Sequence, residues 1–155
     1  MAPRELDTLI FFVTSRCNSL CRTCFYWQEL NSKDDLSFEE IVRLSSTMPP
    51  FNEIWLSGGE PSLREELVDI VGTFYRTNGV RSINYPANGI LPGKLRDTLE
   101  AIFAACPEIR VNLNLALDGI EETHDRIRGV PGNFAKALES LELLSELRSR
   151  EPRLR

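Results

Sequence analysis

A fourfold alternation between short apolar runs and amphipathic stretches dominates this sequence and limits the folds open to it. Apolar, β-rich runs predict four strands, at residues 6–14, 53–56, 81–85 and 110–117. Amphipathic stretches after them predict four helices, at about 38–47, 63–78, 94–105 and 133–147. Strands that alternate with helices in this way pair in parallel through right-handed crossovers, so we expect an α/β fold.

Two helix starts carry a capping-box pattern, in which a serine precedes a glutamate by three residues. These are Ser37 with Glu40 and Ser62 with Glu65. Asn78-Gly79 is a typical helix end, and we expect it to end the helix that begins at Ser62. Apolar spacing assigns one inward face to each of the later helices: Leu63, Leu67, Ile70, Val71 and Phe74; Leu95, Leu99, Ile102 and Phe103; Phe134, Ala137, Leu138, Leu141 and Leu144. We also expect Val111, Leu113, Leu115 and Leu117 to share the apolar face of the last strand, and Trp55 to pack in the core or against a helix rather than stack on a cofactor.

Length and composition limit the classes of protein. The 155 residues are enough for one domain, and residues 148–155 are charged and expected to fray. The net charge of −5 argues against a nucleic-acid partner, and no apolar run is long enough for a membrane span. Closely spaced thiols without a leader pattern favour a reducing compartment, so we expect a cytoplasmic protein.

Three of the four cysteines follow the first predicted strand with the spacing Cys17-x3-Cys21-x2-Cys24. Thiolates are ligands that iron–sulfur clusters and zinc prefer, and three donors leave one coordination position open for a substrate or cofactor. Two other interpretations remain: cysteines packed on one helix face, and a structural zinc site completed by His124 or Cys106. Cys106 precedes Pro107 at a helix end, where inert packing is the simplest expectation.

The ends of the four predicted strands carry the cysteine loop, Ser57-Gly58-Gly59-Glu60-Pro61, Ala87-Asn88-Gly89 and Leu117-Asp118-Gly119. Each glycine pair or dipeptide is by itself compatible with an ordinary turn. Because parallel strands present their carboxyl ends at one edge of the sheet, the four segments together predict one composite site there.

The motifs Cys17-x3-Cys21-x2-Cys24 and Gly58-Gly59-Glu60-Pro61, in this order, resemble the radical S-adenosylmethionine superfamily. Residues 117–120 (Leu-Asp-Gly-Ile) followed by 124–129 (His-Asp-Arg-Ile-Arg-Gly) resemble the branch that contains SPASM/Twitch peptide-maturing enzymes and the molybdenum-cofactor cyclase. The resemblance implies a partial (β/α)6 TIM-like barrel. This chain would form its parallel (βα)4 portion, as a single core domain over residues 1–155 with four of the six units.

The same resemblance implies cofactors and site residues. Cys17, Cys21 and Cys24 would ligate a [4Fe–4S] cluster whose fourth iron is chelated by S-adenosylmethionine. Further cofactor contacts would come from the segments that carry Thr23, Gly58, Gly59, Glu60, Pro61, Asn88, Asp118 and Arg128. Reductive cleavage of S-adenosylmethionine would give a 5′-deoxyadenosyl radical that abstracts hydrogen from a peptide or small-molecule substrate, with electrons from a flavodoxin or ferredoxin. No residue is assigned as catalytic.

Three positions depart from the family pattern: Thr23 stands where an aromatic residue is usual, Ala116 where a serine is common, and Ala87 where a threonine is common. With only four units, we expect either a missing carboxyl-terminal barrel half or self-association along the edge of the fourth strand. The alternative function is a non-catalytic iron–sulfur or zinc module derived from a truncated relative. A plain folded domain with reduced thiols is the third possibility. For His124 we expect a role in orienting the loop after the fourth strand, and for Arg128 either a cofactor carboxylate or an ion pair with Asp125 or Glu122.

Overall fold

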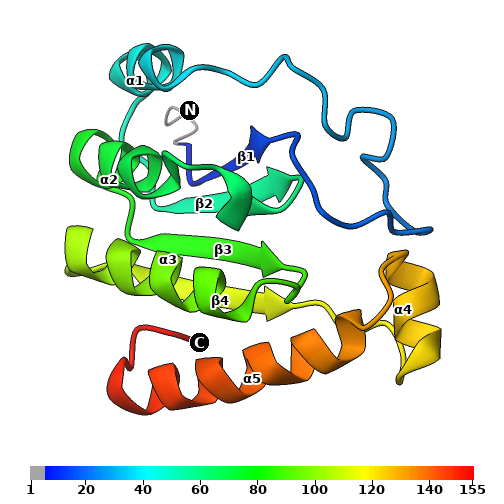
Figure 1. The fold of residues 1–155 in the computed structure, drawn as a ribbon. Coiled ribbons are helices and arrows are strands. Elements are labelled where there is room, and N and C mark those ends of the chain that lie inside the picture. The colour runs from blue at the N-terminus through cyan, green and yellow to red at the C-terminus, as the bar shows by residue number, and fades with distance from the viewer. Residues whose placement is uncertain (1–5) are drawn as a thin grey trace.

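The computed structural model describes residues 6–155. Its strands form one four-stranded parallel sheet in the order β1-β2-β3-β4: β1 (Thr8–Thr14), β2 (Glu53–Gly58), β3 (Ser82–Ala87) and β4 (Arg110–Leu115). The main helices are α1 (Phe38–Thr47), α2 (Leu67–Thr77), α3 (Pro92–Ala105) and α5 (Asn133–Arg150). Figure 1 shows the strands pointing the same way, so that their carboxyl ends meet at one edge. The predicted α/β fold with four parallel strand–helix units is confirmed.

Within the described residues, helices cover one face of the sheet and leave the other open. Alternate strand side chains such as Phe11, Leu56 and Ile83 are buried against the inward residues of the helices and form the core. The side chains between them point to the other face, where Phe12 is 46% exposed and Trp55 44% exposed. The expectation that Trp55 packs in the core or against a helix is therefore wrong, because its position in β2 places it on the uncovered face.

The first capping box is confirmed and the second is not. The Ser37 hydroxyl accepts the Glu40 N–H, and the Glu40 carboxylate accepts the Ser37 N–H. At the second pattern, the chain forms a short 3-10 helix, η1 (Pro61–Leu63), and α2 begins only at Leu67, without a side-chain cap. The reason is that the Ser62 hydroxyl donates to the Glu60 carboxylate instead, and Leu63 consequently lies outside α2.

The inward faces are correct for α2 and α3 within their observed bounds, but not for α5. Leu138 and Leu141 are 41% and 51% exposed, whereas Ala137 and Leu144 are buried. Leu117 lies beyond the end of β4 and is also exposed. The apolar face of α5 is therefore wider than the part of it that packs against the rest of the molecule.

The carboxyl-terminal segment does not fray. After α5 the chain turns back, and Leu154 forms a parallel bridge with Val111 and is 3% exposed. Backbone bonds run from the Val111 N–H to the Arg153 carbonyl at 3.0 Å and from the Leu113 N–H to the Arg155 carbonyl at 2.9 Å. The prediction of a frayed tail is wrong, because a buried leucine and the free edge of β4 hold these charged residues in place.

One further helix lies at the carboxyl edge. Helix α4 (Glu122–Arg128) occupies the segment between β4 and α5 that the sequence patterns suggest is a loop. Figure 1 shows it beyond the strand ends, next to the loop that follows β1. Among residues 6–155, no helix has the length and apolar character needed to cross a membrane.

Candidate active site

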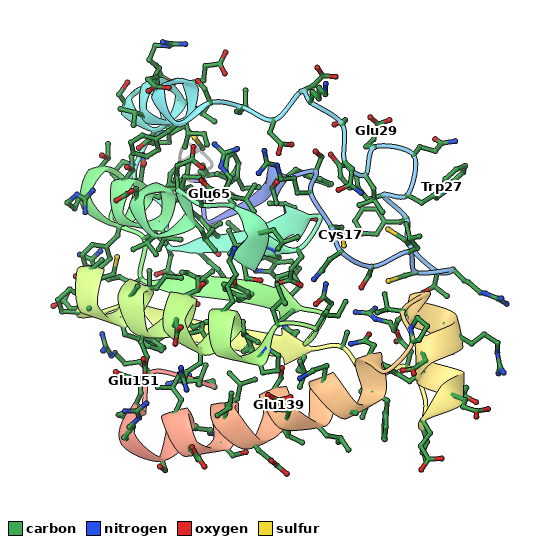
Figure 2. The ribbon with its side chains drawn as sticks, in the orientation of Figure 1. Cys17, Trp27, Glu29, Glu65, Glu139 and Glu151 are labelled. Carbon is green, nitrogen blue, oxygen red and sulfur yellow. The ribbon has the colours of Figure 1, made fainter. Side chains whose placement is uncertain are left out.

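The long connection from β1 to α1 carries the three clustered cysteines and returns to the sheet through Asp35. The Asp35 carboxylate accepts the Thr14 hydroxyl at 2.8 Å and the Ser15 N–H at 2.6 Å. The Asn31 side chain accepts the Cys17 N–H at 3.1 Å. These bonds fix both ends of the loop close to the end of β1. In Figure 2, Cys17 lies near the strand ends, while Trp27 lies on the outer side of the loop.

The loop after β2 is in direct backbone contact with the cysteine loop. The Gly59 N–H donates to the Thr14 carbonyl at 2.7 Å, and the Glu60 N–H donates to the Arg16 carbonyl at 2.8 Å. A β-carbon at Gly59 would lie 2.0 Å from the Arg16 carbonyl oxygen. Glycine is therefore required here so that the two loops can approach, a more specific reason than close approach of a ligand.

Glu60 joins the ends of β2 and β3. Its carboxylate accepts the Asn88 N–H and the Ser62 hydroxyl, each at 2.8 Å, and the residue is 4% exposed. Burial raises the pKa of Glu60 above its usual value, and these hydrogen bonds oppose that rise. Both carboxylate oxygens thus have protein donors, which hold the Glu60 side chain between the ends of β2 and β3.

The cysteine loop and the strand ends enclose a cavity of about 270 Å³. Its lining combines residues from all four strand ends: Cys17, Ser19, Cys21, Thr23, Cys24, Phe25, Leu30, Gly58, Gly59, Glu60, Pro86, Ala87, Asn88, Asn114, Ala116 and Arg128. The predicted composite site at one edge of the sheet is thus present as a cavity, and all three clustered cysteines line it.

The three thiols line one cavity without meeting at one point. Within residues 6–155, no three His, Cys, Asp or Glu side chains are arranged to hold a single metal ion. A tetrahedral zinc ion needs such an arrangement, whereas a four-iron cluster binds each thiolate on a different iron and its ligands stand apart. As they stand in the structure, the three cysteines therefore line one cavity but do not form a site for a single ion.

Neither of the two suggested fourth zinc ligands is available. Cys106 is buried in the hydrophobic core at the end of α3, which precedes β4 and lies away from the carboxyl edge. His124 is fully buried, and both its ring nitrogens have protein partners: the Asp118 N–H at 3.1 Å and the Asn133 side-chain oxygen at 3.2 Å. His124 thus orients the loop after β4, as its sequence context predicts, and Cys106 packs.

Two residues dominate the electrostatics of the cavity, the buried thiol of Cys17 and the guanidinium of Arg128. Burial raises the pKa of the Cys17 thiol, and the nearby Glu60, Cys21 and Cys24 raise it further. The Ser19 N–H, which donates to the Cys17 sulfur at 3.5 Å, lowers it. A bound cation is what would favour the thiolate here. Arg128 brings positive charge to the cavity and pairs with Asp118 at 3.1 Å, not with Asp125 or Glu122.

Two buried polar atoms of the cavity lining have no protein partner among the described residues. They are the Nε of Arg128 and the hydroxyl of Ser19. A buried donor without a partner costs free energy, about 1–3 kcal/mol for an ordinary group, so such atoms indicate a place where a ligand can bond.

Comparison with known proteins identifies the family. The family model described as Radical SAM superfamily matches residues 11–151. The chain belongs to the radical SAM superfamily. This family uses a [4Fe–4S] cluster and S-adenosylmethionine, so the predicted family and its cofactors are confirmed at the level of the family.

Individual relatives support the same assignment. The Fe-coproporphyrin III synthase of Methanosarcina barkeri is 28% identical over 141 residues, covering 89% of this chain and 34% of the relative. The GTP 3′,8-cyclase of Rhodopirellula baltica is 32% identical over 136 residues, covering 83% and 36%. A solved structure of histidine-tagged anSMEcpe with bound AdoMet has a TM-score of 0.68 at 22% identity, covering 94% of this chain and 42% of that one. The TIM-like radical SAM fold is confirmed, and the chain spans about a third of the length of these two curated relatives.

Most residues predicted for cofactor contact reach the cavity of this radical SAM domain. Thr23, Gly58, Gly59, Glu60, Asn88 and Arg128 line it, as do the departures Ala87 and Ala116. Pro61 and Asp118 do not line it: Pro61 starts η1, and Asp118 pairs with Arg128. Sequence reasoning missed Ser19, for which no pattern gives a signal, and Asn114, which the polar alternation of β4 already placed on the uncovered face.

Proposed function

We propose that this domain binds a [4Fe–4S] cluster through Cys17, Cys21 and Cys24 and binds S-adenosylmethionine beside it. The observation that carries the proposal is that these three cysteines and Gly58-Gly59 line the same cavity. Three soft donors leave one position of a four-iron cluster for the amino-acid end of the cofactor. Localisation in the cytoplasm and a flavodoxin or ferredoxin as electron donor belong to the same proposal.

The residues present fit such a cofactor. A carboxylate is a strong acceptor for a guanidinium, and the Nε of Arg128 is a buried donor without a protein partner among the described residues. The hydroxyl of Ser19 is a second buried group of this kind in the same lining. The raised pKa of Cys17 fits a ligand that is neutral until a metal centre stabilises its thiolate.

Cys17, Cys21 and Cys24 would hold the cluster, which when reduced would supply one electron for cleavage of S-adenosylmethionine into methionine and a 5′-deoxyadenosyl radical that takes hydrogen from a substrate. The residues of the chain itself would hold the cluster and orient the cofactor. The Ser19 N–H donates to the Cys17 sulfur, a contact that lowers electron density on that ligand. Arg128 orients a carboxylate, and Asp118 holds Arg128 in place.

The substrate is a peptide or a small molecule, and the chemistry of the complete reaction belongs to the proposal. The uncovered face of the sheet continues from the cavity through Asn114 and Pro86, which line both. A substrate placed on this face would be next to the cofactor.

Anaerobic reconstitution with iron and sulfide tests the proposal. We expect about four irons per chain and a brown chromophore in the wild type, and a change in the electron paramagnetic resonance spectrum of the reduced protein when S-adenosylmethionine is added. Cys17→Ala, Cys21→Ala and Cys24→Ala should each lose most of the iron. Cys106→Ala is the matched control, because it removes a buried thiol outside the cavity.

Two results would argue against the proposal. Binding of one zinc per chain in place of iron would favour a structural zinc module. A complete cluster whose spectrum does not respond to S-adenosylmethionine would favour a non-catalytic iron–sulfur module.

A further inference from the structure

Helix α4 is joined to the cysteine loop backbone to backbone. The Leu20 N–H donates to the Arg128 carbonyl at 3.1 Å, and the Arg22 N–H donates to the Ile127 carbonyl at 2.9 Å. These carbonyls belong to the last turn of α4, where no N–H group of the helix itself is left to donate to them. The cysteine loop supplies the missing donors. A β-carbon at Gly129 would lie 2.5 Å from the Leu20 carbonyl oxygen, so the approach is close. The end of α4 thus sets the position of the segment between Cys17 and Cys24.

His124 is the buried residue that fixes α4 itself. Its Nδ1 accepts the Asp118 N–H at 3.1 Å, so the ring proton is on Nε2, which donates to the Asn133 side-chain oxygen at 3.2 Å. The residue is 0% exposed, and its ring packs edge-on to Phe134. One neutral imidazole therefore connects the loop after β4 to the first turn of α5.

From Asn133 the chain of hydrogen bonds returns to the cysteine loop. The Asn133 side-chain amide donates to the Asn88 carbonyl at 3.2 Å. The Asn88 side-chain amide in turn donates to the Asn18 side-chain oxygen at 2.7 Å. On the other side, Asp118 pairs with Arg128. Two routes thus lead from His124 to the site. One passes through Asn88, which lines the cavity, to Asn18 in the cysteine loop, and the other ends at Arg128, which also lines the cavity.

We propose that His124 is a positioning residue, which fixes α4 between Asp118 and Asn133 and so sets the placement of the cysteine loop relative to Arg128. The consequence for S-adenosylmethionine binding rests on the function proposed above. The consequence for the cysteine loop does not, because it concerns hydrogen bonds within the protein alone.

Three substitutions separate the two bonds of His124. Asparagine offers an acceptor close to the place of Nδ1, and glutamine offers a donor close to the place of Nε2, whereas alanine offers neither. His124→Asn should therefore keep the bond from Asp118, and His124→Gln should keep the bond to Asn133. Ser45→Ala is the matched control, since it removes a buried hydrogen bond between α1 and Asn78, on another part of the molecule.

Amide hydrogen exchange of the protein without cofactor is the first measurement. His124→Ala should accelerate exchange at Leu20, Arg22 and Asp118 about tenfold, the scale of one lost hydrogen bond, beyond any change in global stability. His124→Asn should restore slow exchange at Asp118, and His124→Gln should not. Unchanged exchange at Leu20 and Arg22 in His124→Ala, or acceleration equal to that in Ser45→Ala, would overturn the inference.

Affinity for S-adenosylmethionine, followed by the spectrum of the reduced cluster, is the second measurement. His124→Ala should bind it about tenfold more weakly than the wild type while retaining the same iron content. Equal affinity in the two proteins would contradict the positioning role for the cofactor. If the wild type does not respond to S-adenosylmethionine but the exchange results hold, the proposed function fails and the positioning of the cysteine loop stands.

Discussion

Gly58 shows how a single residue can set the distance between two loops. Its φ is +96°, and a β-carbon there would lie 2.4 Å from the Thr14 carbonyl oxygen. Gly79 also has a positive φ, +77°, but a β-carbon there would meet nothing within 4 Å. The two positions therefore share the backbone strain of a non-glycine residue and differ in the steric clash.

Replacing each glycine by alanine separates these effects. Gly79→Ala should cost about 1–3 kcal/mol of unfolding free energy from the left-handed conformation alone. Gly58→Ala should cost more, and it should also reduce iron incorporation because the clash pushes the cysteine loop away from β2. Urea unfolding and iron analysis of both variants provide the measurement, and equal losses in the two variants would contradict the clash.

The sequence motifs were enough to predict which segments form the site. Four strand ends at one edge brought Cys17, Gly58 and Asn88 to one cavity, because parallel strands leave no other arrangement. The use of individual polar groups could not be predicted. Ser62 donates to Glu60 rather than capping α2, and this choice depends on the three-dimensional position of Asn88.

Asp125 is an example of how one element supports the start of another. Its carboxylate, on α4, accepts the N–H groups of Gly132 and Phe134 at the start of α5. The hydrogen bond from the Phe134 N–H is the main cause that lowers the pKa of Asp125 below its usual value. A carboxylate with a lowered pKa stabilises the folded state above its unfolded pKa, and this contribution is lost as the pH falls through the lower folded value.

The pH dependence of Asp125→Asn follows from this sign. At neutral pH the variant should be less stable than the wild type, and the difference should shrink as the pH falls below about 4. Urea unfolding over this range measures it, with Glu142→Gln on the exposed side of α5 as the control. A difference between wild type and Asp125→Asn that grows on acidification would contradict the assignment.

The carboxyl-terminal segment acts as an element of the sheet despite its short length. Leu154 is 3% exposed beside β4, so Leu154→Ala should lower the unfolding free energy by about 2–4 kcal/mol. Leu138→Ala, at an exposed position of α5, should change it by much less. Chemical denaturation of the two variants compares them, and similar small effects would show that the segment contributes little.

Element types were predictable where apolar periodicity was strong, and less so where tertiary contacts decide. α1 begins at Phe38 behind its capping box, as predicted, because a local hydrogen-bond pattern specifies that start. α4 was missed because its one buried residue, His124, is polar and gives no apolar stripe. The order of residues 153–155 was missed because it depends on the free edge of β4.

Taken as a whole, the described part of the chain is a sheet that is open on one face and along part of β4. Leu113, Leu115, Leu141 and Leu154 line a small groove at that edge. The relatives are longer, and this chain matches 34% of one and 36% of another. Residues of this chain alone line the cavity at the four strand ends. The expectation of a missing barrel half or of self-association at β4 remains a prediction.

Release of 5′-deoxyadenosine from S-adenosylmethionine, measured on the full chain after anaerobic reconstitution and reduction, decides whether this domain performs radical chemistry. We predict release that requires the reductant, is abolished by Cys24→Ala and persists in Cys106→Ala. Wild-type protein with a complete cluster that releases no more 5′-deoxyadenosine than Cys24→Ala would contradict the proposed function.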